Sequence, residues 1–241
     1  MTEAKVRLCV DHPLRQGQTV PLTEAQAHYL FGVMRLGAGG QVLLFNGQDG
    51  EWLASVAEAG KRRGTLLCDD QTRGQDLPPD LWLLFAPIKK ARTDFIVEKA
   101  VEMGVRRILP VQTEFTNAER IRQDRLQAHA REAAEQCGAT YVPAVEELAP
   151  LTRVLAGWDT GRLLWFADED TAGAPVAEPA QKGGAAAILI GPEGGFSATE
   201  RARLRLLPFV VPMTLGPRIL RADTAAVAAL TLWQASYGDW R

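Results

Sequence analysis

Two glycine-containing turns near the C-terminus hold the residues whose types and spacing best suit a binding site. The first reads IGPEGG over residues 190–195, and the second reads LGPRILR over residues 215–221. Glycine permits positive φ angles and close approach of the backbone, so such turns suit a flat ligand that main-chain groups hold. Four charged or polar side chains would belong to the same pocket: Glu193, Arg218, Arg221 and Thr224.

Each turn follows a short apolar run and precedes a helical pattern. The runs are residues 185–190 and 209–213. Loops that follow parallel strands meet at the carboxyl edge of the sheet, where α/β proteins bind ligands. Residues 168–184, rich in Gly, Pro and Ala, follow a further apolar run at 163–167. The sequence therefore predicts a pocket built from three loops at one sheet edge.

The glycine spacing disfavours several familiar sites. No G-x-x-x-x-G-K-[ST] motif indicates a P-loop, and no G-x-G-x-x-G follows the first strand of a βαβ unit. No G-x-S-x-G motif or Cys/His dyad indicates an acyl-transfer hydrolase. The cysteines and histidines are scattered, so we expect neither a metal site nor disulfides. The thiols predicted to be free and buried are Cys9, Cys68 and Cys137.

Composition and charge indicate a globular protein of the cytoplasm. The 241 residues are long enough for two domains, and 46% are hydrophobic and 23% charged. Apolar runs such as 81–88 are too short to span a bilayer, and the N-terminus has no apolar signal core. Residues 89–131 carry a net charge of +4, residues 201–221 carry +5 and residues 146–178 carry −5. Basic segments favour nucleic-acid binding, although solvated helix faces would give the same pattern.

The first 73 residues form a β-rich pattern. Short extended segments are expected at 6–10, 41–45, 51–56 and 65–68. The segment Thr23-Glu24-Ala25-Gln26 fits a capping box at the start of a short helix. Residues 74–80 contain Gly74, Pro78 and Pro79 without periodic apolar residues. We therefore predict a small β-barrel domain over 1–73, a linker over 74–80 and a second domain over 81–241.

Strands alternate with helices after residue 81. Strands are expected at 81–86, 106–111, 141–145, 163–167, 185–190 and 209–214. Helices are expected at 93–103, 126–137, 146–156, 197–207 and 222–237, and Ser197-Ala198-Thr199-Glu200 fits a second capping box. This alternation predicts an α/β domain with a parallel sheet covered by helices on both faces.

Five motifs, in the same order along nearly the whole chain, resemble those of the RsmE family of SPOUT-class methyltransferases. IGPEGGFSATE (190–200) and LGPRILRADTA (215–225) resemble its two cofactor loops. KARTDFIVEKAVEMGV (90–105) resembles its lysine-rich stretch through Lys99, Glu102 and Gly104, and EQCG (135–138) with Val142-Pro143 resembles another family segment. In the first domain, 28–35 and 45–47 resemble the remaining family elements.

The resemblance implies a fold and a function that periodicity does not show. It implies a SPOUT domain with a trefoil knot, a PUA-like N-terminal barrel that binds RNA, and a homodimer with each pocket near the subunit interface. It implies methyl transfer from S-adenosylmethionine (SAM) to N3 of a uridine in 16S rRNA, either free or within the 30S subunit. Neither a metal nor a membrane partner is expected.

Site residues follow from the matched motifs. The expected cofactor-binding residues are Leu189, Ile190, Gly191, Glu193, Gly194, Leu215, Gly216, Ile219, Leu220 and Thr224. Arg221 is the candidate catalytic residue, because a cation would stabilise a uridinate; the alternative is a structural ion pair with Asp223 or Glu193. The expected RNA-binding residues, each otherwise a solubility charge, are Arg35, Lys89, Lys90, Arg92 and Lys99.

Four positions depart from the family pattern. Asp223 replaces a glutamate, Asn46 replaces an aspartate, and Phe115 and Ala139 replace arginines. Two other functions stay open at this point. One is a non-catalytic RNA-binding or ribosome-assembly factor, which the intact glycine turns argue against. The other is a SPOUT methyltransferase that acts on another RNA or base.

Overall fold

The chain divides into two compact units, each described here by itself. The computed structural model describes residues 6–171 and 184–240. Unit 1 comprises residues 1–77 and 134–142, and unit 2 comprises residues 78–133 and 143–241. Residues 134–142, which fall within the predicted second domain 81–241, cluster with unit 1, where Arg7 donates hydrogen bonds to the carbonyl oxygens of Ala134 and Ala139, both at 2.8 Å.

Unit 1 is built on a five-stranded sheet in the order β1-β3-β4-β5-β2. The strands are β1 (Arg7–Cys9), β2 (Thr19–Pro21), β3 (Gln41–Phe45), β4 (Glu51–Ala59) and β5 (Gly64–Arg73). β1 pairs with β3 in parallel, and the other pairs are antiparallel. The predicted β-rich fold of this part of the chain is confirmed. Among the described strands, β1 and β2 form the two edges of the sheet and do not pair with each other.

A short helical segment covers the sheet of unit 1. α1 (Glu24–Ala27) begins at the predicted capping box, in which Thr23 and Gln26 exchange hydrogen bonds of 3.0 and 3.3 Å. It continues into a π-helix, η1 (His28–Val33), which the sequence analysis did not predict. Leu30 of η1 is fully buried in the core with strand residues such as Val42 and Leu66.

Unit 2 is an α/β domain with a parallel sheet, as predicted. Its strands are β6 (Leu81–Phe85), β7 (Arg107–Gln112), β8 (Ala144–Val145), β9 (Ala149–Pro150), β10 (Leu163–Ala167), β11 (Ala186–Ile190) and β12 (Val210–Met213). They pair in the order β12-β10-β11-β6-β7-β8, and β9 pairs with β7. Every described pair is parallel.

Helices form at all five predicted places after residue 81, but three of them begin three or more residues away from the predicted start. The helices are α2 (Lys90–Glu102), α3 (Gln123–Cys137), α4 (Leu151–Ala156), the 3₁₀-helix η2 (Glu169–Thr171), α5 (Ala198–Arg205) and α6 (Ala222–Tyr237). The last four residues of α3, 134–137, belong to unit 1. The helix predicted at 146–156 begins only at Leu151. Pro150 disfavours helical geometry for the residue before it, and this segment forms β9 instead.

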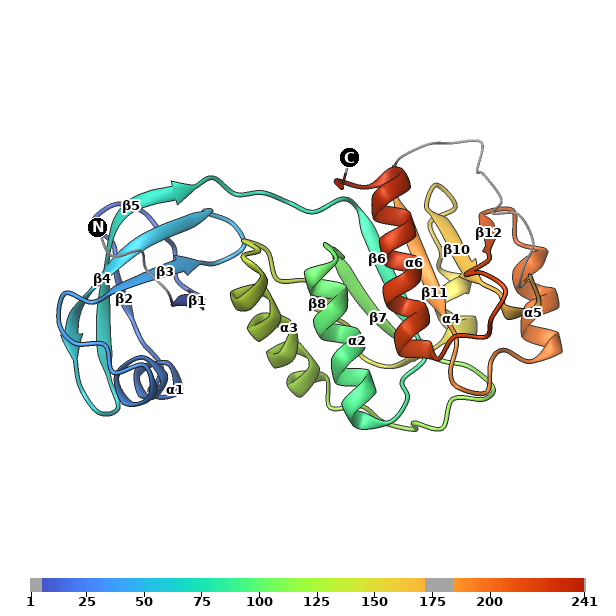
Figure 1. The fold of residues 1–241 in the computed structure, drawn as a ribbon, viewed down its shortest axis with the longest axis horizontal. Helices are drawn as coiled ribbons and strands as arrows, with labels where there is room; N and C mark the ends of the chain where they lie inside the picture. The colour runs from blue at the N-terminus through green and yellow to red at the C-terminus, as the bar shows by residue number, and fades with distance from the viewer. Residues whose placement is uncertain (1–5, 172–183, 241) are drawn as a thin grey trace. The chain divides into compact units, whose positions relative to one another are not determined.

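Apolar side chains on both faces of the sheet hold these helices. α6 packs against α2 and β11, and Ala229, Leu230 and Trp233 of α6 are buried (Figure 1). A second cluster packs Leu164, Phe166 and other strand residues against residues of α4 and α5. The trefoil knot stays a prediction, because strand pairing and helix contacts do not specify threading.

Three further expectations concern cysteines, membranes and metals. Cys9 and Cys68 are buried, as predicted, and form no disulfide among the described residues, but Cys137, the last residue of α3, is exposed. Within residues 6–171 and 184–240, no helix is long and apolar enough to cross a bilayer. The same residues contain no group of three or more side chains able to hold a metal ion.

Candidate functional site

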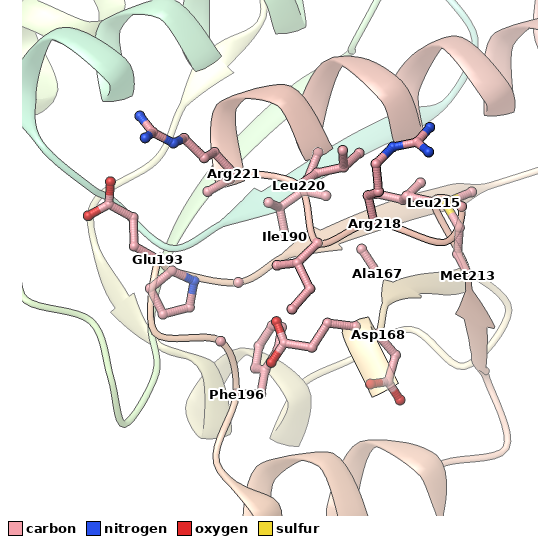
Figure 2. A pocket seen from close by; sticks show the side chains of 18 of the residues that line it. Ala167, Asp168, Ile190, Glu193, Phe196, Met213, Leu215, Arg218, Leu220 and Arg221 are labelled. Carbon is pink, nitrogen blue, oxygen red and sulfur yellow. The ribbon is translucent and has the colours of Figure 1, made fainter. Parts of the chain in front are cut away.

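A cavity of about 450 Å³ lies at the carboxyl edge of the sheet of unit 2. Both glycine-containing turns, the residues after β10 and the first turns of α2 and α6 contribute to its wall (Figure 2). Its lining residues are Lys89, Arg92, Ala167, Asp168, Glu169, Ile190, Gly191, Pro192, Glu193, Gly195, Phe196, Met213, Leu215, Gly216, Arg218, Ile219, Leu220, Arg221, Ala222 and Ala225.

The strand register explains why three distant segments meet here. β10 pairs with β12 so that Ala167 stands beside Met213, and with β11 so that Phe166 stands beside Leu189. The three parallel strands therefore end together, and the loops that follow them share one edge. This is the three-loop arrangement that the apolar runs predicted; residues 172–183 of the first loop lie outside the described residues.

The first glycine turn, residues 190–195, has no room for side chains at two positions. A Cβ added at Gly191 would overlap the ring of Phe196. Gly195 has a φ of +71°, and a Cβ there would overlap the carboxylate of Glu169. The turn then enters α5 through the predicted capping box, in which Ser197 and Glu200 exchange hydrogen bonds of 3.0 and 3.2 Å. These contacts hold the backbone of the turn close to the cavity.

The second turn, residues 215–221, gives the cavity an apolar side. Leu215 and Leu220 are half-buried, whereas the side chain of Ile219 is 81% exposed although it lines the cavity. Gly216 has a φ of +98°, which favours glycine. An apolar side chain that stands in solvent beside a cavity is available to cover a bound ligand.

An acidic loop after β10 is tied to α5 by ion pairs. The fully buried carboxylate of Asp168 accepts a hydrogen bond of 2.8 Å from Nε of Arg205, which raises the pKa of Arg205. Arg201 pairs with Asp170 at 2.9 Å and also with Glu169. The acids that line the cavity on this side are therefore neutralised. Sequence reasoning placed this loop at the edge but missed Asp168 and Glu169, although three successive acids face the arginine-rich segment 201–205.

Arg92 holds the ion pairs that the sequence analysis considered for Arg221. Its Nη1 lies 2.7 Å from Oε1 of Glu193, and its Nε lies 3.6 Å from Oδ2 of Asp223. Lys89, Arg218 and Arg221 line the cavity without an ion pair to any described residue. Figure 2 shows Arg221 on the side of Glu193, and Arg218 on the side of Met213. The cavity opening therefore carries cations without paired acids, which favours an anionic partner.

Most of the predicted cofactor residues reach the cavity. Ile190, Gly191, Glu193, Leu215, Gly216, Ile219 and Leu220 line it, as does the catalytic candidate Arg221. Leu189, Gly194 and Thr224 are not among the lining residues, and the cofactor role of all ten residues stays a prediction. Phe196 and Met213 line it but were missed, because apolar residues at a strand end or helix start look like core in sequence.

The predicted RNA-binding residues divide into two groups. Lys89 and Arg92 line the cavity, and Lys90 is exposed in the first turn of α2. Nζ of Lys99 instead lies 2.6 Å from Glu102. Arg35 belongs to unit 1, where it is exposed and, among the described residues, is the one non-glycine residue with a positive φ, +56°. Its left-handed backbone follows the end of η1.

The departures from the family pattern have visible local roles. Phe115 is 44% exposed and packs beside Gly194 of the first glycine turn. Asn46 accepts hydrogen bonds of 3.0 and 2.8 Å from the backbone N–H groups of Gln48 and Asp49, which closes the turn before β4. Asp223, one methylene shorter than glutamate, stands 3.6 Å from Arg92.

Comparisons with known proteins show the family of this chain. The RNA methyltransferase domain family matches residues 75–234, and the RNA methyltransferase PUA domain family matches residues 22–67. The ribosomal RNA small subunit methyltransferase E of Synechocystis sp. is 33% identical over 88% of this chain and 71% of its own length. That of Rickettsia conorii is 27% identical over 93% of both chains.

Two solved structures share the fold over nearly the whole chain. The ribosomal RNA small subunit methyltransferase E of Neisseria gonorrhoeae, solved bound to SAM, is 26% identical, with a TM-score of 0.88 over 98% of this chain and 99% of that chain. A methyltransferase of Legionella pneumophila, solved with SAM, is 27% identical, with a TM-score of 0.86 over 97% and 98%. The chain belongs to the ribosomal RNA small subunit methyltransferase E family, within the RNA methyltransferase domain family.

Proposed function

We propose that this chain transfers the methyl group of SAM to N3 of a uridine in 16S rRNA. One observation carries the proposal: both glycine-containing turns and the loop after β10 line a single cavity whose opening holds Lys89, Arg218 and Arg221. The relative from N. gonorrhoeae, which shares the fold, was solved bound to SAM. A cofactor pocket beside unpaired cations suits methyl transfer to a polyanion.

The residues of the cavity fit this cofactor. The half-buried side chains of Leu215 and Leu220, with Ile219, give apolar surface for an adenine ring, and the glycine turns bring backbone groups close to it. The volume of about 450 Å³ lies within the usual range for small-molecule sites. Bound SAM supplies an electrophilic methyl carbon on a positively charged sulfur.

Arg221 is the residue that we assign to the reaction itself. Uracil N3 carries a proton, and its lone pair attacks a methyl carbon only as that proton leaves. Negative charge then spreads to the neighbouring carbonyl oxygens of the base. A guanidinium stays charged and offers two N–H groups to such oxygens, so Arg221 beside the base would stabilise the developing uridinate. Its exposure and lack of an ion pair within the described residues leave it available for this contact.

The RNA-binding residues of this proposal are Lys89, Lys90 and Arg218 in unit 2 and, separately, Arg35 in unit 1. Lys89 and Arg218 flank the cavity, and Lys90 follows Lys89 at the start of α2. Arg35 lies in the unit that contains the PUA-domain match. We further propose that the protein is cytoplasmic, acts as a homodimer and meets its uridine in 16S rRNA of the 30S subunit.

The reaction is tested with substrate that lacks the modification. Purified protein and SAM are incubated with 30S subunits and with naked 16S rRNA from a strain without the enzyme, and nucleosides are measured by mass spectrometry. We expect 3-methyluridine. A different methylated nucleoside would indicate another base, and SAM binding without any methylation would indicate a non-catalytic assembly factor.

The role of Arg221 is tested by separating cofactor affinity from turnover. Arg221→Ala should lower kcat about 100-fold, the usual size of a lost electrostatic contact to the transition state, with a smaller change in SAM affinity. Arg203→Ala, an exposed arginine of α5 outside the cavity, is the matched control. Unchanged turnover in Arg221→Ala would remove this residue from the chemistry.

A further inference from the structure

Arg92 stands between the two glycine-containing turns. Its guanidinium lies 2.7 Å from the carboxylate of Glu193, which belongs to the first turn. It also lies 3.6 Å from the carboxylate of Asp223, in the first turn of α6 directly after the second glycine-containing turn. Arg92 itself belongs to α2, so one side chain joins three segments that are far apart in the sequence.

The shape of arginine suits this arrangement. Nη1 donates a hydrogen bond to Glu193, while Nε lies within ion-pair distance of Asp223, an arrangement that the planar fork of a guanidinium permits. The side chains are 31% exposed for Arg92, 40% for Glu193 and 21% for Asp223, so solvent screens the pairs only in part. A lysine ammonium at this position would act as a single point charge.

Neighbouring contacts hold the backbone of α2 in place at Arg92. The neighbouring Thr93 side chain is buried, and its hydroxyl donates to the carbonyl oxygen of Ile88 and accepts from the N–H of Ile88, both at 3.0 Å. α2 also packs against α6, the helix that carries Asp223. A fixed helix therefore presents Arg92 to one carboxylate in the first glycine-containing turn and to another in the first turn of α6, directly after the second glycine-containing turn.

We propose that Arg92 is a positioning residue that holds the two glycine-containing turns in register through Glu193 and Asp223, and so sets the affinity of the cavity for SAM. This inference rests on the proposed function, since SAM is the ligand. It replaces the expected role of Arg92 as an RNA contact, because its guanidinium already faces two carboxylates, unlike Lys89 beside it.

The main test compares SAM binding with RNA binding in the full-length protein. Arg92→Gln removes the charge, Arg92→Lys keeps it without the fork, and Arg122→Gln removes an exposed arginine–aspartate pair outside the cavity as a matched control. By calorimetry, we expect the Kd for SAM to rise about 3- to 10-fold in Arg92→Gln and less in Arg92→Lys. The Kd of the Arg92 variants for 16S rRNA should stay at the wild-type value. The Kd of Arg122→Gln for SAM should also stay at the wild-type value.

The outcomes separate this inference from the proposed function. If wild-type protein binds no SAM, both fail. If wild-type protein binds SAM and Arg92→Gln binds it equally well, the inference alone is overturned. A loss of rRNA affinity without a loss of SAM affinity would likewise overturn it, and would return Arg92 to the RNA-binding residues. Steady-state kinetics gives a second readout, because a positioning role predicts a raised KM for SAM with an unchanged KM for rRNA.

A double-mutant cycle tests the pairing itself. Asp223→Glu adds one methylene and brings the carboxylate closer to Nε of Arg92 than the present 3.6 Å. In otherwise wild-type protein we expect the Kd for SAM to fall about 2-fold. In the Arg92→Gln background the same substitution should have no effect. An equal effect in both backgrounds would show that Asp223 acts independently of Arg92 and would overturn the proposed linkage.

Discussion

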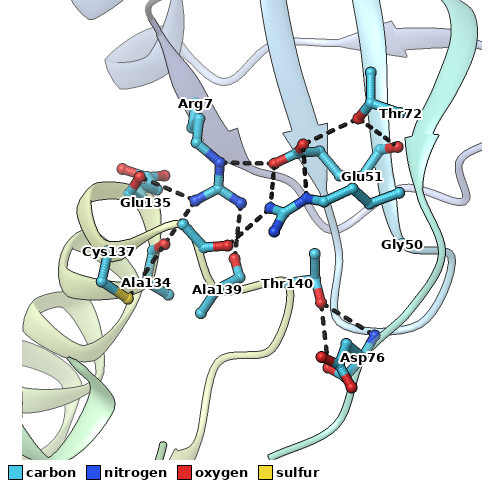
Figure 3. Close-up of polar contacts among 12 residues, drawn as sticks. Arg7, Gly50, Glu51, Thr72, Asp76, Ala134, Glu135, Cys137, Ala139 and Thr140 are labelled. Atoms are coloured by element: carbon cyan, nitrogen blue, oxygen red, sulfur yellow. Dashed lines mark hydrogen bonds and ion pairs between the residues drawn. The ribbon is translucent and has the colours of Figure 1, made fainter. Parts of the chain in front are cut away.

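Two ion-pair networks in this chain are built in opposite ways. In unit 1, one carboxylate, Glu51, stands between two arginines, Arg7 and Arg73, each 2.8 Å away (Figure 3). In the cavity of unit 2, one arginine, Arg92, stands between two carboxylates. The Glu51 side chain is 6% exposed, whereas every member of the Arg92 network is more than 20% exposed.

Burial changes what each network does. Burial alone would raise the pKa of Glu51, but hydrogen bonds from Arg73, Arg7 and Thr72 outweigh it and lower the pKa. Arg7 also donates to the carbonyl oxygens of Ala134 and Ala139, so it satisfies backbone groups at the end of α3. When a buried charge loses its partner, water cannot solvate the charge, and the folded state is strongly destabilised. When a half-exposed charge loses its partner, water solvates the charge and the loss of stability is small.

The difference teaches where stability and function lie. The Glu51 network connects strands to the end of a helix within one unit, and it should decide whether that unit folds. The Arg92 network connects loops around a cavity, and it should decide how well a ligand binds. Each of the following predictions tests one side of this contrast.

The largest effect is expected at Glu51. Glu51→Ala leaves the largely covered guanidinium of Arg7 without its carboxylate partner, so we expect a loss of about 3 kcal/mol in the free energy of unfolding, the lower end for a broken buried pair because Arg73 is half-exposed. Chemical denaturation measures the loss. Arg122→Ala, which breaks the exposed pair with Asp124 but keeps the acid in the first turn of α3, is the control and should unfold like the wild type. Equal effects of the two substitutions would break the contrast.

The same network predicts a pH dependence of stability. The pKa of Glu51 is lowered from 4.5 in the folded protein, so its contribution is fully present above about 4.5. It is lost as the pH falls through the folded pKa, because the unfolded chain then binds the proton more readily. The difference in unfolding free energy between wild type and Glu51→Gln should therefore be constant from pH 7 to pH 5 and shrink below that. A difference that grows on acidification would contradict the sign of this pKa shift.

A smaller effect is expected from the backbone of the first glycine-containing turn. Gly195→Ala places a Cβ at a φ of +71° and against the Glu169 carboxylate, and we expect a loss of about 2 kcal/mol without SAM. Gly216→Ala is the matched control, since its φ of +98° has open space around it and should cost about 1 kcal/mol. Differential scanning calorimetry checks both. Equal losses would show that Glu169 moves aside freely.

Local signals in the sequence predicted much of this fold. Thr23 and Ser197 mark helix starts because a capping box satisfies backbone groups within four residues. The strand runs and glycine turns predicted the edge where the cavity lies, because parallel strands end together. α4 begins only after Pro150, because proline disfavours helical geometry for the residue before it, and the apolar pattern of the segment does not show this effect.

Long-range polar contacts could not be predicted in this way. Arg7 lies 127 residues from Ala134, and Arg92 lies 101 residues from Glu193. A charged residue on a helix looks the same in sequence whether it faces solvent, RNA or a carboxylate from a distant loop. For that reason the sequence did not indicate that residues 134–142 cluster with unit 1, or that Arg92 faces two carboxylates.

The smallest expected effect completes the contrast. Arg92→Gln should change the free energy of unfolding by less than about 1 kcal/mol without SAM, because its pairs are partly solvated. At saturating SAM the wild type should gain more stability than the variant, since a ligand stabilises the folded state in proportion to the logarithm of its concentration over Kd. Thermal denaturation with and without SAM measures both quantities. A loss in the absence of SAM as large as that of Glu51→Ala would mean that the Arg92 network holds the fold itself, and that partial exposure does not separate binding from stability in this chain.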